Sequence, residues 1–333
     1  MPRVTIIDPN QRWTRLGLEG APAYAGLLTF AGLPYTEESG ELAGCDAAVV
    51  GAPMDELASD RPGTRAGPRA IRMESTETGR HLEAGVDWSE VLRVVDFGDA
   101  PMVPADPAAS HRAIEALVSE VREAGAIPLI LGGDHSITEP GVRGCASDGP
   151  IGLIHFDAHT DTAQELWGAE LSHGTPMYRL VDQGKVDGRR YVQIGLRGYW
   201  PGEREFAWQE SQGITSLFMH DVRRLGLEAV LGRALEVVGD QPSFLTVDID
   251  VLDPAFAPGT GTPEPGGMSA HELLWACRTL AEATELVGAD VVEVLPARNG
   301  PVDVTALVAG RVVGEVLTGL ALRDQRRSRD AQT

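Results

Sequence analysis

The stretch that decides the fold is Ile151–Asp161, IGLIHFDAHTD, in which an apolar run ends in alternating acids and histidines. Two further stretches share this design: Ile127–Ser136 (IPLILGGDHS) and Ser243–Asp250 (SFLTVDID). Continuous apolar runs of this length are typical of parallel strands that are buried on both faces. Ligands of such sheets gather at the carboxyl ends of the strands. The three stretches therefore predict a mostly parallel sheet with polar side chains collected at one edge.

The rest of the chain continues the alternation of short apolar runs and helical patterns. We predict further strands at residues 47–51, 91–95, 191–194 and within 286–294, and helices at residues 110–124, 270–284 and 304–320. This order is typical of an α/β fold in which helices cover both faces of one sheet. We expect a single domain at residues 41–323, preceded by an irregular arm at 1–40 and followed by a charged tail at 324–333 that frays.

Composition excludes several classes of protein. The formal net charge is -21 over 333 residues, which argues against binding to a nucleic-acid backbone. The same charge suits a cationic substrate, but it is explained equally well by solubility. The three cysteines, Cys45, Cys145 and Cys277, form no Cys-x-x-Cys pair, so neither a disulfide framework nor a zinc ribbon is expected. We find no signal peptide and no membrane-spanning run, and we expect a cytoplasmic protein.

The polar blocks at the strand ends have the composition of a metal site. Alternate side chains of an extended chain point the same way, so Asp157, His159 and Asp161 project together, as do Asp248 and Asp250. With His135 the set holds four carboxylates and two imidazoles. Carboxylates and imidazoles without thiolates suit Mn²⁺, with Zn, Ni, Co and Fe as competitors. Because carboxylates can bridge, six such groups can hold two ions about 3.5–4 Å apart.

Each block also has a structural explanation when it is taken alone. Gly132–Ser136 could be a glycine turn with an Asx cap, and Asp248–Asp250 could be a solvated acidic loop. The occurrence of all three blocks at successive strand ends favours the metal site. We expect His155 and Asp134, which lie beside ligands, to orient them by hydrogen bonds. Three further histidines carry no motif, and we interpret them as ordinary helix or loop residues: His111, His220 and His271.

These blocks resemble the ureohydrolase family, which includes arginases, agmatinases and guanidino-acid hydrolases. The resemblance extends from about Val49 to Leu322. Four segments are similar to the agmatinase branch: Asp248–Met268 (DIDVLDPAFAPGTGTPEPGGM), Arg61–Arg72 (RPGTRAGPRAIR), Ser172–Leu180 (SHGTPMYRL) and Asp290–Val294 (DVVEV). The resemblance implies a three-layer α/β/α fold of the arginase and deacetylase type, in trimers or hexamers.

The resemblance also implies roles for individual residues. It assigns two Mn²⁺ ions per chain to the following ligands: His135 and Asp161 for one ion, His159 and Asp250 for the other, and Asp157 and Asp248 bridging both. His173 is implied as a proton shuttle, although alone it would be an ordinary loop histidine. Glu293 is implied as the acceptor of the substrate guanidinium, although alone it could pair with Arg298. Asp161 is the best placed group to protonate the leaving amine.

The reaction implied is hydrolysis of a guanidino group to urea and a primary amine, with agmatine giving putrescine as the first candidate. Alternatives are a guanidino acid, such as 4-guanidinobutyrate or 3-guanidinopropionate, and a larger guanidino metabolite. Leu57, Ala58 and Asn299 depart from the agmatinase pattern, and Arg298 could face an acidic tail.

Three other classes of protein fit less well. A zinc amidohydrolase of the deacetylase type needs one metal and fewer ligands than this set offers. A non-catalytic relative would have broken ligands, and none is broken here. A dinucleotide site is excluded because Gly132-Gly133 leads into Asp-His without a GxGxxG pattern.

Overall fold

The computed structural model describes residues 6–331 except 19, 23, 77–78 and 298–301. In these residues eight strands form one sheet in which every neighbouring pair is parallel. The strands are β1 (Ala47–Ala52), β2 (Val94–Asp99), β3 (Ile127–Gly132), β4 (Ile151–Phe156), β5 (Val186–Leu196), β6 (Thr215–Phe218), β7 (Ser243–Asp248) and β8 (Leu286–Val292). The predicted parallel sheet is confirmed.

The order of the strands explains where the polar blocks meet. The sheet runs β2-β1-β3-β8-β7-β4-β5-β6, so β8 and β7 lie between β3 and β4. After β4 the chain moves on to β5, and after the neighbouring strand β7 it moves the other way, to β8, so the winding of the sheet has a switch point between β7 and β4. β3, β4 and β7 precede the three polar blocks, and β8 precedes Glu293. These four strands are neighbours in the sheet, in the order β3-β8-β7-β4. Ligands of open α/β sheets bind at such a switch point, outside the carboxyl ends of the strands.

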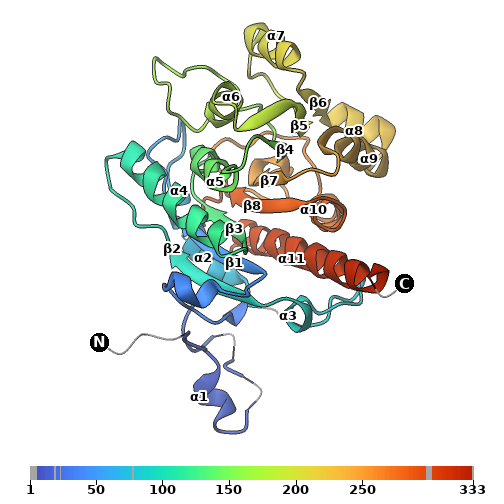
Figure 1. Cartoon of the computed structure of the whole chain (residues 1–333). Coiled ribbons are helices and arrows are strands. Elements are labelled where there is room, and N and C mark those ends of the chain that lie inside the picture. The colour runs from blue at the N-terminus through green and yellow to red at the C-terminus, as the bar shows by residue number, and fades with distance from the viewer. Residues whose placement is uncertain (1–5, 19, 23, 77–78, 298–301, 332–333) are drawn as a thin grey trace.

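Helices cover both faces of the sheet, as a three-layer α/β/α fold requires (Figure 1). Alternate residues of β1 belong to different cores: Ala47 and Val49 face one, Ala48 and Val50 the other. The first core packs against α2 (Gly67–Glu74), α3 (Trp88–Val91), α8 (Met219–Leu225), α9 (Leu227–Val238), α10 (Ala270–Ala283) and α11 (Val304–Asp330). The second packs against α4 (Pro107–Glu123), α5 (Thr138–Cys145) and α6 (Pro176–Asp182). A further helix, α7 (Glu203–Gln212), precedes β6.

Several boundaries differ from the prediction; β5, for example, begins at Val186 instead of residue 191. Two of the differences have a visible cause. The strand predicted at residues 91–95 begins at Val94. Asp87 accepts a hydrogen bond from Ser89 N and caps the short helix α3, which ends at Val91, the first residue of the predicted strand. Residues 324–330 of the charged segment are helical and do not fray, since α11 continues to Asp330. Arg326 and Arg327 pair there with Glu282 and Glu285, which holds the last turns against the body of the protein.

Helix α11 is long and apolar enough to cross a membrane by length and composition alone. However, 72% of its apolar window is buried inside the protein, and it packs along α10. Burial by other elements is typical of a core helix. Its apolar face is therefore explained by the fold.

The N-terminal arm is partly ordered. It contains the short helix α1 (Gln11–Thr14), which lies apart from the sheet in Figure 1, and the 3-10 turns η1 (Phe30–Gly32) and η2 (Ser39–Leu42). Tyr35 bridges to both Ile7 and Asp96, so the arm is tied to the β2 edge of the sheet. Phe30 anchors it in the core.

Candidate metal centre

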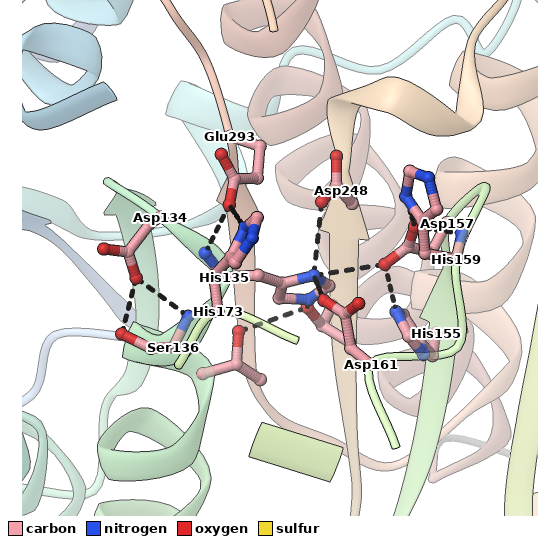
Figure 2. A network of polar contacts seen from close by, with 12 residues as sticks. Asp134, His135, Ser136, His155, Asp157, His159, Asp161, His173, Asp248 and Glu293 are labelled. Carbon is pink, nitrogen blue, oxygen red and sulfur yellow. Dashed lines mark hydrogen bonds and ion pairs between the residues drawn. The ribbon is translucent and has the colours of Figure 1, made fainter. Parts of the chain in front are cut away.

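His135 lies at the centre of the first group of polar side chains (Figure 2). It begins the 3-10 turn η4 (His135–Ile137) after β3, and its side chain is fully buried. Its Nδ1 lies 3.1 Å from Asp157 Oδ2, 2.9 Å from Asp161 Oδ2 and 3.2 Å from Asp248 Oδ2. One ring nitrogen cannot donate a proton to three carboxylates at once. The arrangement is that of four ligand atoms around a common cation.

A second group of ligand atoms shares one residue with the first. His159 Nδ1 lies 3.0 Å from Asp250 Oδ2 and 3.4 Å from Asp157 Oδ1. Asp157 therefore presents one carboxylate oxygen to each group, which is the geometry of a bridging ligand. Asp250 is on the 3-10 turn η5 (Ile249–Val251), and its backbone N–H donates to Asp248 Oδ1 at 2.8 Å. The structure thus places all six side chains selected from the sequence in two groups of ligand atoms. Asp157 belongs to both groups, whereas Asp248, which the resemblance implies as a second bridge, belongs to the His135 group only.

The charges in the cluster also fit bound cations. Burial raises the pKa of Asp248 well above its ordinary value, and the charges of Asp250 and Asp157 add to the effect. Burial lowers the pKa of His159, but Asp250 and Asp157 outweigh it and raise that pKa to about 12. Several buried acids that repel one another in this way are stabilised by positive charge between them. The residues present therefore fit a pair of divalent metal ions.

Buried polar groups behind the cluster fix the ligand orientations. His135 Nε2 donates to Thr246 Oγ1 at 3.0 Å, which leaves the lone pair of Nδ1 directed at the three carboxylates. His155 Nε2 donates to Asp157 Oδ2 at 2.8 Å, as predicted, and its Nδ1 meets Tyr191 Oη at 2.9 Å. Sequence analysis missed Thr246 and Tyr191. The alternation of strand residues could have found Thr246, since it lies on the same side of β7 as Asp248.

Replacing Thr246 with valine is expected to weaken Mn²⁺ binding by about 10- to 100-fold, because the hydrogen bond that orients His135 is lost while the shape is kept. Isothermal titration calorimetry of metal-free protein measures this. Thr318→Val is a matched control, since that buried hydroxyl donates to Gly314 O within α11, away from the cluster. Equal Mn²⁺ affinity in the two variants would contradict the orienting role of Thr246.

Glu293 follows β8 and joins the cluster to His173. Its Oε1 accepts from His135 N at 2.9 Å and from His173 Nδ1 at 2.9 Å. Its backbone is held at a φ of 59°, and Asp161 has a φ of 47°. Such strained conformations in non-glycine residues persist where the surroundings enforce them, and they cluster at functional sites. Burial lowers the pKa of His173, but the hydrogen bond and charge of Glu293 raise it to about 9.

The loop after β1 completes the surroundings of His173. Ser59 contacts His173 Nε2 through both its Oγ, at 2.6 Å, and its N–H, at 3.1 Å. Leu57 O accepts the His173 N–H at 3.2 Å. No local sequence pattern predicts the Ser59 contact. The departures from the agmatinase pattern at Leu57 and Ala58 thus fall in a loop that touches His173, whereas Asn299 and Arg298 lie outside the described residues.

The prediction that Asp134 orients a metal ligand is wrong. It does not hydrogen-bond a ligand side chain of the cluster; its carboxylate accepts from Ser136 N and Oγ and from Leu57 N. It is therefore the Asx cap of η4 and a tie to the loop after β1. The structural explanation of the GGDHS block applies to Asp134, and the metal explanation applies to His135. Gly133 is required by close packing, since a Cβ there would lie 1.7 Å from Met54 O.

The other histidines behave as predicted for structural residues. His111 is buried in α4 against Ser136 Oγ, at 3.1 Å, and burial lowers its pKa to about 4. His220 is exposed beside Asp221. His271 lies in the first turn of α10 and belongs to none of the groups of candidate metal ligands found among the described residues.

Comparisons with known proteins agree with this geometry. The model of the Arginase family matches residues 45–319. The guanidinopropionase of Pseudomonas aeruginosa is 42% identical over 307 residues, covering 90% of this chain and 93% of that protein. The mitochondrial agmatinase of Gallus gallus is 40% identical, covering 82% and 81%. The structure of proclavaminate amidino hydrolase from Streptomyces clavuligerus superposes with a TM-score of 0.85 at 35% identity, over 91% of this chain and 100% of that one. With the family model matching most of its length, the chain belongs to the arginase family, the ureohydrolases that its strand-end blocks resemble.

Proposed function

We propose that the chain uses two Mn²⁺ ions to hydrolyse a short linear guanidino compound, releasing urea and a primary amine. Membership of the arginase family supports hydrolysis of a guanidino group. The observation that carries the proposal is the pair of ligand groups that share Asp157. Their hard oxygen and imidazole donors, without thiolate, are those that Mn²⁺ accepts.

The ions would be held by the ligands assigned above: His135 and Asp161 on one side, His159 and Asp250 on the other, and Asp157 and Asp248 between. When bound, two metal ions lower the pKa of a shared water and so supply a nucleophile at neutral pH. A guanidinium carbon needs such a nucleophile, because its positive charge is spread over three nitrogens and makes it a poor electrophile.

The remaining side chains would bind the substrate and move protons. Glu293 Oε2 is buried and has no hydrogen-bond partner in the described part of the chain, so it can accept a guanidinium N–H. The leaving nitrogen needs a proton, and we assign its donation to Asp161, whose Oδ2 lies 2.9 Å from His135 Nδ1 in the first ligand group. His173 carries a proton on Nδ1 toward Glu293 and contacts Ser59 through Nε2, which suits a relay outward from the site.

Three kinds of guanidino substrate are candidates. The amine tail of agmatine was favoured by the resemblance of residues 248–268 to the agmatinase branch, and a relative is named agmatinase. A carboxylate tail is favoured by the similarity to a guanidinopropionase over most of both chains. The departures at Leu57 and Ala58 weigh against agmatine without naming another tail. A larger guanidino compound is the third possibility, since proclavaminate amidino hydrolase is similar over 91% of the chain.

A substrate panel tests the proposal and distinguishes the tails. Mn²⁺-loaded protein is assayed for urea release from agmatine, 4-guanidinobutyrate, 3-guanidinopropionate, arginine and free guanidine. We expect a value of kcat/KM for one compound that exceeds the others by about 100-fold or more, because a site that pairs one charged tail leaves the opposite charge unpaired. Absence of urea from every compound, with two ions bound per chain, would contradict a short linear substrate.

A cytoplasmic location and assembly into a trimer or hexamer are part of the same proposal. The N-terminal arm exposes several large apolar side chains: Leu16, Leu18, Tyr24, Leu27 and Leu28. Clusters of exposed apolar side chains are typical of surfaces that contact another protein chain. The strong negative charge supports neither nucleic acid nor an anionic membrane as a partner.

A further inference from the structure

The two carboxylate oxygens of Glu293 are in different situations. Oε1 is satisfied by two donors, His135 N and His173 Nδ1. Oε2 is buried and accepts no hydrogen bond from the residues that the structure describes. Burying a carboxylate oxygen without a hydrogen-bond donor destabilises the folded protein, unless a bound ligand supplies the donor. The oxygen therefore borders a place where a donor group is expected.

The loop that carries Gly261 is fixed beside this oxygen. Gly259 N donates to Thr305 Oγ1 at 2.9 Å, and Gly259 O accepts from Leu295 N at 2.9 Å. On the other side, Thr262 Oγ1 donates to Asp250 Oδ2 at 3.3 Å. Gly261 is thus held between the residues that follow β8 and one of the metal-ligand candidates.

Gly261 leaves a gap bordered by two acceptors. A Cβ at this position would lie 3.4 Å from Glu293 Oε2 and 3.4 Å from the carbonyl oxygen of Arg61. The lack of a side chain therefore keeps open the space next to both oxygens. A guanidinium is planar and carries N–H donors around its edge, so it can meet acceptors on more than one side.

We propose that the Arg61 carbonyl and Gly261 complete the guanidinium pocket, with the substrate cation bound between Glu293 Oε2 and Arg61 O. This inference rests on the proposed function and adds a second acceptor to it. Because the second acceptor is a backbone carbonyl without charge, it recognises the guanidino group and is indifferent to the charge of the tail. Glycine is required at position 261 because a methyl group would occupy the gap.

The backbone allows this requirement to be tested separately from folding. The φ of Gly261 lies outside the left-handed region, and the contacts of an added Cβ, at 3.4 Å, are ordinary van der Waals contacts. Alanine therefore fits the fold while it fills the gap. Gly314→Ala is a matched control, because a Cβ at that helical glycine meets no atom within 4 Å.

The experiment compares the Mn²⁺-loaded wild type, Gly261→Ala and Gly314→Ala. For Gly261→Ala we expect KM for the best guanidino substrate, and the inhibition constant of guanidinium ion as a tail-less competitor, to rise together by about 10-fold or more. Mn²⁺ stoichiometry and melting temperature should match those of the wild type. Gly314→Ala should change none of these quantities.

The other outcomes for Gly261→Ala contradict the inference, each in a different way. Unchanged constants in Gly261→Ala would show that the gap holds no part of the substrate. A rise in KM without a rise in the inhibition constant of guanidinium ion would place the substrate tail, and not the guanidino group, in the gap. Loss of the fold would show that the methyl does not fit. Absence of urea release by the wild type would instead count against the proposed function itself.

Discussion

Asp250→Ala is expected to bind one Mn²⁺ fewer per chain and to lose at least roughly 1,000-fold in kcat, because the second ion of a pair that activates one water is removed. Asp250 is the only acid besides Asp157 in the His159 group of ligand atoms found among the described residues. Metal analysis after gel filtration, together with a urea assay, measures both effects. The rise in melting temperature on adding Mn²⁺ should shrink in parallel.

The control for this substitution is Asp240→Ala, which removes an exposed carboxylate. Asp240 precedes β7 and so lies at the amino end of that strand, whereas the ligand candidates lie at the carboxyl ends. It should bind two ions and keep full activity. Misfolding of Asp250→Ala is not expected, since the buried acids raise one another's pKa and removing one lessens their repulsion. Two ions and full urea release in Asp250→Ala would remove Asp250 from the ligand set.

Glu293→Gln is expected to lower kcat/KM by about 100- to 1,000-fold while leaving Mn²⁺ binding intact, because an amide cannot pair with the substrate cation. The substitution also changes His173. Its pKa is raised to about 9 by Glu293 against the opposite effect of burial. With the carboxylate gone, the pKa of His173 should fall from about 9, because burial still lowers it and only the smaller effects of Asp161 and Asp134 still raise it.

The titration of His173 can be followed by NMR of histidine-labelled protein, using His173→Asn to identify its signal. Glu272→Gln provides the control, since glutamine preserves the capping box that this residue forms with Ser269 at the start of α10. Retention of a His173 pKa near 9 in Glu293→Gln would show that another group holds the proton there. Normal kcat/KM in that variant would contradict the guanidinium role.

The candidate ligands could be identified from sequence because the physics that places them is local. An apolar run that ends in alternating acids forms a strand end, and parallel strand ends meet at one edge of the sheet. The prediction for His155 rests on its place beside the ligands in the sequence, and the structure confirms its contact with Asp157, two residues further on. What local pattern cannot give is which strands are neighbours. The position of β8 between β3 and β7 is what brings Glu293 to His135 N.

The contacts that sequence analysis missed join segments that are far apart in the chain. Thr246 is 111 residues from His135, and Ser59 is 114 residues from His173. Asp134 was assigned to ligand orientation because it adjoins His135, but its carboxylate turns back to cap η4. The shift of β2 has a smaller cause: Asp87 caps a helical turn where apolar residues alone suggested a strand. Local capping and long-range pairing therefore account for the differences.

The hypothesis that two Mn²⁺ ions are required for activity is tested most directly by a metal titration. Mn²⁺ is added stepwise to chelator-treated protein, and urea release is measured on the best substrate of the panel. We predict that chelator-treated protein is inactive, that binding saturates at two ions per chain and that full activity appears only as the second ion binds. Undiminished urea release after complete removal of metal, or full activity with a single ion bound, would contradict the pair of ligand groups that Asp157 joins.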